Sequence, residues 1–354
     1  MTTSQRGGSG GRGLRIAVGG ATGALGEELL SALSERRFPV RELLPFATER
    51  SLGREVELGD EAVPVECEMP PLRGVDLLIL CTPREASLDL VHQALRAGVF
   101  CIDCSGALSG SSEVPLLISE LCSPREVMVP LVATPCGSAF GWSLVLSALR
   151  EAAGLRRVVG TLLQSASCSG RLGIEALSAE TIALLRQQDP PPSQVFPGPV
   201  AFDCFPSGEL TGPDDGGDGA EDGSEAEEGS LTVSESRLVS DLDRLFPGLE
   251  VVVTSVQVPT FVGEGSALVV ETERPLSMRE AGEVLAKAPG LEFWDQGERP
   301  PSTRDTAGRD TALVGRLRRD RTREGGLLLW VAADGLRLAA ANVVKLAETR
   351  LRLN

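Results

Sequence analysis

The segment 14–33 constrains this chain most, because it joins an apolar run, a glycine-rich turn and a helical pattern. Residues 14–18 form an apolar run typical of a buried strand, and residues 27–33 continue at helical spacing. Between them, three glycines have GxxGxxG spacing. Such a turn lets backbone approach a pyrophosphate at a helix N-terminus. We predict a dinucleotide-binding turn, with a purely structural turn as the alternative. The predicted contact residues are Gly20, Thr22, Gly23, Ala24, Leu25 and Gly26.

The length of 354 residues favours two domains. No run of 18 apolar residues occurs, so we expect no membrane span. Residues 1–13 are glycine-rich and have no apolar core typical of a signal peptide, so we expect a disordered tail and a cytoplasmic protein.

Net charge is −16 and is unevenly distributed. Residues 213–230 contain eight acidic side chains and no basic ones. A segment of this composition buries too little apolar surface to offset the entropy of ordering, so we predict a disordered acidic insertion. The acidic balance argues against nucleic acid as a partner.

The chain has eight cysteines and one histidine. Cys101 and Cys104 form a CxxC within an apparent strand, where their side chains would lie on opposite faces, ~10 Å apart. A disulfide requires Cα atoms within ~7 Å, so we interpret the pair as structural. The single His92 excludes a His-rich metal site, and its helical surroundings predict a surface position.

Buried strands alternate with helices over residues 14–133. This order predicts an α/β fold, a Rossmann-type doubly wound parallel sheet. The predicted strands are 14–18, 42–48, 77–81, 99–103 and 127–132, and the predicted helices are 25–36, 87–97 and part of 115–121.

Residues 134–325 predict an α+β domain, a sheet covered on one face by helices. Its predicted strands are 158–165, 200–205, 249–259 and 266–272, and its predicted helices are 138–153, 174–187, 234–245 and 277–288. Residues 326–354 begin as a strand and end as a long helix, which we expect to return to the dinucleotide-binding domain.

The loop after the second strand has no acidic residue at the strand end and contains Thr48, Arg50 and Ser51. A cation and hydroxyls at this position favour a ribose 2′-phosphate, and therefore NADP over NAD. The alternative is an exposed arginine in a loop. A second arginine, Arg84, follows the third strand and either meets a phosphate or points into solvent.

Several segments, in fixed order, resemble the aspartate-semialdehyde dehydrogenase family over essentially the whole folded chain. GATGALG is similar to its cofactor turn, QSASCSG at 164–170 to its QAVSGAG loop, and VPTFVG at 258–263 to its VPVFRGHS strand. DTALVGRLRRD and LWVAADGLR, at 310–320 and 329–337, are similar to its C-terminal motifs.

The resemblance implies a homodimer formed through the second domain, a dimerisation and substrate domain. It also implies NADP-dependent reduction of L-aspartyl 4-phosphate to the semialdehyde, a step of amino-acid biosynthesis. That chemistry requires a thiolate nucleophile, a proton-transferring histidine and cations that hold an anionic substrate.

The family's NPNCST corresponds to TPCGSA at 134–139. Aligned without a gap, Cys136 falls on the asparagine and Gly137 on the nucleophile, whereas a one-residue gap would restore Cys136. Gln164 is kept, and Glu264 replaces the family's histidine. The candidate catalytic residues are therefore Cys136, Gln164 and Glu264. The family's cationic positions correspond to Val262, Ser109 and Leu231.

Three hypotheses follow. In the first, the chain is a paralogue that keeps the fold, the dimer and NADP(H) binding but has lost the dehydrogenase chemistry. Alternatively, it is an active NADP-dependent aspartate-semialdehyde dehydrogenase that uses Cys136. A third hypothesis is activity on a less anionic substrate, because lost charged hydrogen bonds, ~1.5–3 kcal/mol each, would weaken binding of a doubly anionic one.

Overall fold

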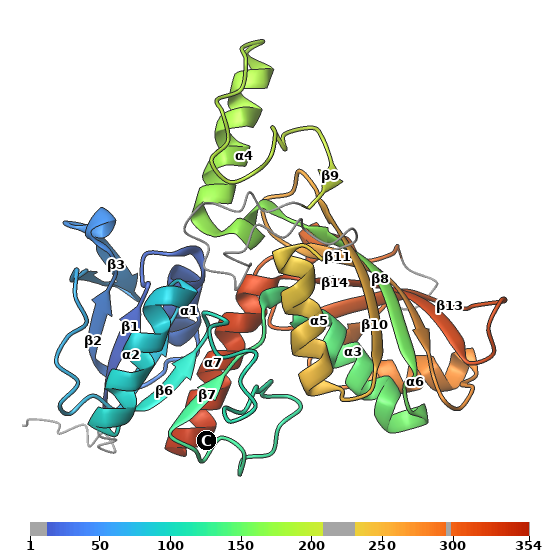
Figure 1. Ribbon diagram of the computed structural model, residues 1–354, viewed down its shortest axis with the longest axis horizontal. Helices are drawn as coiled ribbons and strands as arrows, with labels where there is room; N and C mark the ends of the chain where they lie inside the picture. The colour runs from blue at the N-terminus through green and yellow to red at the C-terminus, as the bar shows by residue number, and fades with distance from the viewer. Residues whose placement is uncertain (1–12, 208–230, 295–298, 354) are drawn as a thin grey trace, which may run out of the picture.

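The computed structural model describes residues 13–207, 231–294 and 299–353. The predicted acidic insertion at 213–230 and nearly all of the predicted tail at 1–13 lie outside these residues. Two sheets lie side by side and helix α7 (Gly335–Leu351) runs between them (Figure 1). No helix of the described part is long and apolar enough to cross a membrane.

The first sheet is parallel and has the order β2-β1-β5-β6-β7. Helix α1 and the C-terminal part of α7 pack on one face, and α2 packs on the other. This arrangement confirms the predicted doubly wound sheet. Its elements are β1 (Leu14–Gly19), α1 (Ala24–Glu35), β2 (Val40–Phe46), β5 (Leu77–Leu80), α2 (Arg84–Ala97), β6 (Phe100–Asp103) and β7 (Leu131–Ala133).

The second sheet is mixed and has the order β12-β13-β14-β11-β8-β10-β9. Helices α3, α5 and α6 cover one face, as predicted, and share one apolar core with it. Its strands are β8 (Arg157–Gln164), β9 (Phe205–Pro206), β10 (Glu250–Gln257), β11 (Glu264–Glu271), β12 (Leu291–Phe293), β13 (Ala312–Arg319) and β14 (Gly326–Ala333). Its helices are α3 (Gly137–Ala153), α5 (Val233–Leu245) and α6 (Met278–Lys287).

Helix α4 (Gly170–Leu185) projects from the junction of the two sheets as an arm, preceded by the short 3-10 helix η2 (Ala166–Ser169) (Figure 1). It begins four residues earlier than the predicted helix 174–187. The segment after α4 packs against this helix through a small core around Leu177, Phe196 and Val200.

Two predicted elements are wrong. The expected helix in 115–121 is a bridge and turns, because Leu116 pairs with Ala133 and Asn342 of α7 binds the backbone of Leu117 and Ser119. In place of the expected strand 200–205, the structure has only the short strand β9 (Phe205–Pro206). The N–H groups of residues 200 and 201 donate to Glu180 of α4 instead of to a neighbouring strand.

Other differences concern boundaries and omissions. The predicted strand 127–132 begins only at Leu131, and the C-terminal strand 326–333 joins the second sheet, so that only α7 returns to the first. The sequence patterns did not predict β12, β13 or the hairpin of β3 (Glu55–Leu58) and β4 (Glu61–Pro64). His92 is exposed on α2, as predicted, and all eight cysteines are free.

Candidate active site

The glycine-rich turn forms one wall of a groove of about 910 Å³ at the carboxyl ends of β1, β2 and β5. Gly20 has φ +70°, and a Cβ there would lie 2.2 Å from the carbonyl oxygen of Cys81. A Cβ on Gly26 would lie 2.3 Å from the carbonyl oxygen of Gly20. Only glycine fits either position. At Gly20 the backbone lies open to the groove and close to the N-terminus of α1, as a bound pyrophosphate requires, whereas Gly26 lets α1 pack closely on the turn.

Most of the predicted cofactor residues line this groove. They are Gly20, Thr22, Gly23, Ala24, Leu25, Thr48 and Arg50. Gly26 and Ser51 do not line it. Ser51 is buried, and its hydroxyl hydrogen-bonds that of Thr22 at 2.8 Å, so that it supports the turn from behind. Arg84 is exposed at the start of α2 and does not line the groove either.

Arg171, which the sequence patterns did not single out, also lines the groove from the start of α4. Its guanidinium donates to the carbonyl oxygen of Thr22 at 3.1 Å and to the carboxylate of Glu27. The arm of the second domain is thereby attached to the glycine-rich turn.

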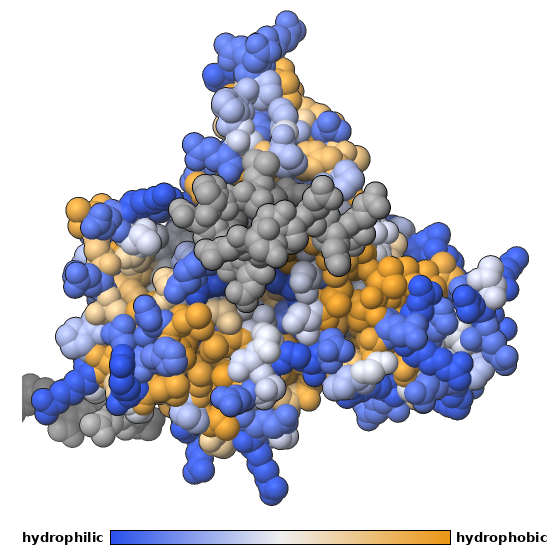
Figure 2. Space-filling view, viewed as in Figure 1, coloured by the Kyte–Doolittle hydropathy of each residue, from blue (hydrophilic) through white to orange (hydrophobic). Residues whose placement is uncertain are grey.

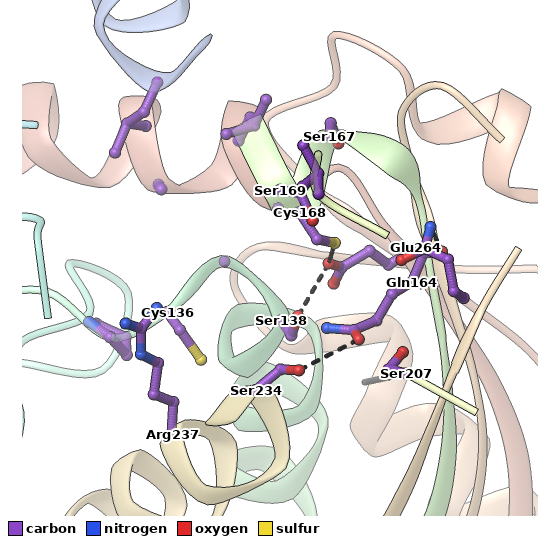
Figure 3. A pocket seen from close by; sticks show the side chains of 18 of the residues that line it. Cys136, Ser138, Gln164, Ser167, Cys168, Ser169, Ser207, Ser234, Arg237 and Glu264 are labelled. Atoms are coloured by element: carbon purple, nitrogen blue, oxygen red, sulfur yellow. Dashed lines mark hydrogen bonds between the residues drawn. The ribbon is translucent and has the colours of Figure 1, made fainter. Parts of the chain in front are cut away.

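A second cavity, of about 160 Å³, adjoins the groove between the N-termini of α3, α5 and α7. All three candidate catalytic residues, Cys136, Gln164 and Glu264, line it. The structure thus brings together side chains from the start of α3, the end of β8 and the start of β11 (Figure 3).

Cys136 is the N-cap residue of α3, and its backbone N–H donates to the carboxylate of Asp241 at 2.7 Å. Burial and the adjacent Asp241 raise the pKa of the Cys136 thiol well above its ordinary value, so the thiolate is disfavoured. In Figure 3 the sulfur points away from Glu264 and toward the helix that carries Arg237.

Gly137 follows directly and has its α-carbon packed against the first turn of α7. A Cβ built on Gly137 would lie 3.1 Å from the carbonyl carbon of Gly335. The two glycines therefore allow α3 and α7 to approach closely, and a Cβ at 137 would require a shift of a few tenths of an ångström.

Glu264 is buried and has its carboxylate oxygen Oε1 at the centre of a cluster of polar groups. The hydroxyl of Ser138 donates to it at 2.9 Å and the thiol of Cys168 at 2.5 Å (Figure 3). Burial, with a smaller contribution from Asp334, raises the pKa of Glu264 despite these hydrogen bonds. Sequence reasoning had not identified Cys168 or Ser138 as site residues.

Gln164 completes this wall of the cavity. The side-chain oxygen of Gln164 accepts a hydrogen bond from Ser234 of α5 at 3.4 Å. Its backbone carbonyl oxygen accepts one from the side chain of Gln257 of β10 at 3.0 Å. The side-chain amide of Gln164 lines the cavity, where Ser234 donates to it.

Among the described residues that line the cavity, Arg237 is the one cation, and its Nε has no hydrogen-bond partner in this part of the chain. Arg237 lies on α5, six positions after Leu231, which is exposed. Neither Val262 nor Ser109 lines the cavity. Arg244 instead donates to the backbone carbonyl of Ser109 and so holds that loop.

Comparisons with known proteins agree with this geometry. Residues 15–128 match the family profile described as semialdehyde dehydrogenase, NAD binding domain, and residues 146–338 match semialdehyde dehydrogenase, dimerisation domain. The aspartate-semialdehyde dehydrogenase of Aquifex aeolicus is 32% identical over 347 residues, which cover 95% of this chain and 97% of the relative. The chain belongs to the aspartate-semialdehyde dehydrogenase family.

Further members of the family confirm the fold. Aspartate-semialdehyde dehydrogenase 2 of Vibrio cholerae is 31% identical over 95% of this chain and 97% of the relative. A crystal structure of the Vibrio cholerae enzyme II, complexed with ASA, superposes with a TM-score of 0.87 at 30% identity and covers 97% of this chain and 99% of that one.

The raised pKa of Glu264 has a consequence for stability. Because its folded-state pKa lies above the unfolded value, folding is favoured below the unfolded pKa and stability is lost as pH rises through the folded pKa. We expect Glu264→Gln to stabilise the protein against urea at pH 8, with the gain shrinking toward pH 4.

Glu57→Gln, on the exposed side of β3, is the matched control and should give no such pH-dependent gain. A difference between Glu264→Gln and the unmodified protein that stays constant from pH 4 to pH 8 would contradict the prediction.

Proposed function

We propose that this chain is an NADP(H)-binding homodimer of the aspartate-semialdehyde dehydrogenase family in which the acyl-phosphate and semialdehyde chemistry is lost. The observation that carries the proposal is that Gly137, at the ungapped nucleophile position, has no side chain and packs against Gly335, where even a Cβ would lie only 3.1 Å from the carbonyl carbon.

The charges around the cavity support the same proposal. A working site needs a nucleophile with an accessible thiolate, a proton carrier and cations for an anionic substrate. Here Cys136 lies beside Asp241, Glu264 stands where the family's histidine is expected, and Arg237 alone supplies positive charge among the described lining residues. A doubly anionic acyl phosphate would be weakly bound in these surroundings.

The alternative is an active NADP-dependent aspartate-semialdehyde dehydrogenase that uses Cys136. It is favoured by the common location of Cys136, Gln164 and Arg237 in one cavity beside the groove.

A turnover assay beside a binding measurement on the same preparation separates these functions. We expect NADPH to bind, measured by fluorescence titration, with no phosphate-dependent reduction of NADP in the presence of L-aspartate semialdehyde. Turnover that disappears in Cys136→Ser, while NADPH binding persists, would refute the loss of chemistry.

The preference for NADP rests on Arg50, whose side chain is exposed at the groove. When the cofactor is bound, its nicotinamide would supply hydride chemistry, and Arg50 would hold the 2′-phosphate. We expect Arg50→Ala to weaken NADPH binding about tenfold or more and NADH binding far less, because one charge-assisted hydrogen bond contributes ~1.5–3 kcal/mol.

Arg84→Ala is the matched control, since Arg84 is an exposed arginine outside the groove. If calorimetry shows that both variants weaken NADPH binding equally, Arg50 acts only through net charge.

The homodimer is supported by the open face of the second sheet. On this face, side chains of β8, β10, β11 and β14 alternate with the buried core positions, and Val252 is 44% exposed. Trp330 on β14 has its Nε1 buried without a partner among the described residues. Figure 2 shows hydrophobic side chains gathered over this sheet. A continuous apolar surface of this kind marks an interaction site.

We expect Val252→Asp to convert the dimer to monomers, measured by size-exclusion chromatography with light scattering. Arg279→Asp places a carboxylate on α6, in the helix layer on the opposite side of the sheet, and should leave the dimer intact. A dimer that survives Val252→Asp unchanged would place the interface elsewhere.

A further inference from the structure

Cys81 and Cys104 lie side by side, each directly after a strand of the first sheet. Strands β5 and β6 pair in parallel with Leu80 opposite Asp103, and the N–H of Cys104 donates to the carbonyl oxygen of Leu80 at 2.9 Å. The next residue along each strand is a cysteine. Because in-register neighbours in a sheet lie ~4.8 Å apart, this register places the two α-carbons within the ~4.4–6.8 Å that a disulfide spans.

The side chains of Cys81 and Cys104 also share one face of the sheet. Both pack against the apolar core that the sheet forms with α1 and α7, whereas Cys101 belongs to the core on the α2 side. The two cysteines of the CxxC therefore lie on opposite faces, as the sequence predicts. The thiol that faces Cys104 comes from the neighbouring strand instead.

The two thiols differ in access and in acidity. Both are free and partly buried, but Cys81 lines the groove and Cys104 lines the second cavity. Contact with the Cys81 side chain, followed by burial, raises the pKa of the Cys104 thiol well above its ordinary value. A reagent that enters the groove therefore meets Cys81 first, with a protonated thiol beside it. An accessible thiol next to a second one is typical of redox-active cysteine pairs.

We propose that Cys81 and Cys104 form a redox-active dithiol that closes to a disulfide by exchange with a small-molecule disulfide. Cys81 loses its proton, and its sulfur attacks one sulfur of the reagent, whose S–S bond breaks and releases one thiol. Cys104 then loses its proton, and its sulfur attacks that of Cys81 and expels the second thiol. The two protein thiols are oxidised to one disulfide, and the reagent is reduced to two thiols.

This site goes beyond the proposed function, because the exchange needs neither a dinucleotide nor the ancestral nucleophile. Its effect would be local to the wall between the two spaces. The carbonyl oxygen of Cys81 already packs against the α-carbon of Gly20 in the glycine-rich turn. A bridge from Cys81 to Cys104 would join this wall of the groove to the wall of the second cavity.

Peptide mapping of the full chain tests the proposal. The protein is incubated with glutathione disulfide, its remaining thiols are blocked with N-ethylmaleimide, and it is digested with trypsin without reduction. Cleavage after arginine places Cys81 in peptide 74–84 and Cys104 in peptide 97–125. We expect a cross-link between these two peptides to be the main disulfide within the chain, and dithiothreitol to release it.

Variants assign the bridge, since peptide 97–125 also contains Cys101 and Cys122. Cys101→Ala is the matched control, because its thiol is buried on the other face, and it should form the bridge as the unmodified protein does. Cys104→Ser should lower the yield of cross-link about tenfold or more and leave glutathione attached to Cys81. Cys81→Ser should remove the cross-link and leave Cys104 largely unmodified, because Cys104 is the harder thiol to ionise.

Three results would overturn the proposal. The first is the lack of this cross-link, or a bridge from Cys81 to Cys168 in its place, while the exposed Cys204 takes up glutathione. The second is a cross-link of unchanged yield in Cys104→Ser, with folding checked by circular dichroism. The third is uptake of glutathione by Cys104 in Cys81→Ser as fast as by Cys81 in Cys104→Ser. None of these readouts requires NADP or turnover, so failure here is separable from failure of the proposed function.

Discussion

Helix α7 determines how the two sheets lie relative to each other. It packs against α1 of the first domain and α3 of the second, and its buried Arg337 binds the carboxylates of Glu28, Glu35 and Asp310. Removing Arg337 would leave three carboxylates without the cation that they share, which would be destabilising. Because the groove and the second cavity meet beside the N-terminus of this helix, every distance in the site depends on its placement.

The close approach of α3 and α7 explains the chemistry that the site can support. Gly137 and Gly335 bring the two helix N-termini into close contact, and a Cβ on Gly137 would lie 3.1 Å from the carbonyl carbon of Gly335. Two of the cysteines that line the cavity each contact a carboxylate. Cys136 faces Asp241, whereas Cys168 faces Glu264 at the junction with the groove. The carboxylates suppress free thiolates, so any thiol reaction here depends on proton transfer to a neighbouring base.

Much of the fold could be predicted because the relevant signals are local. Apolar periodicity identified β1, β5 and α1, and the glycines identified the turn between β1 and α1. The expected helix in 115–121 failed because Asn342, more than 220 residues away, binds its backbone groups. The expected strand at 200–205 failed for the same kind of reason, since the carboxylate of Glu180 replaces a neighbouring strand as the hydrogen-bond acceptor.

The sequence by itself determined the glycine-rich turn, the family, and the absence of a nucleophilic side chain at Gly137, because each is a property of residue identity and short spacing. Through the resemblance it also predicted that Gln164 and Glu264 share a site, and both line the second cavity. Only the tertiary structure decided that Cys168 contacts Glu264, 96 residues away, and that Arg237 lines the cavity. Such pairings arise where strand and helix ends converge, and no local pattern records which ends will meet.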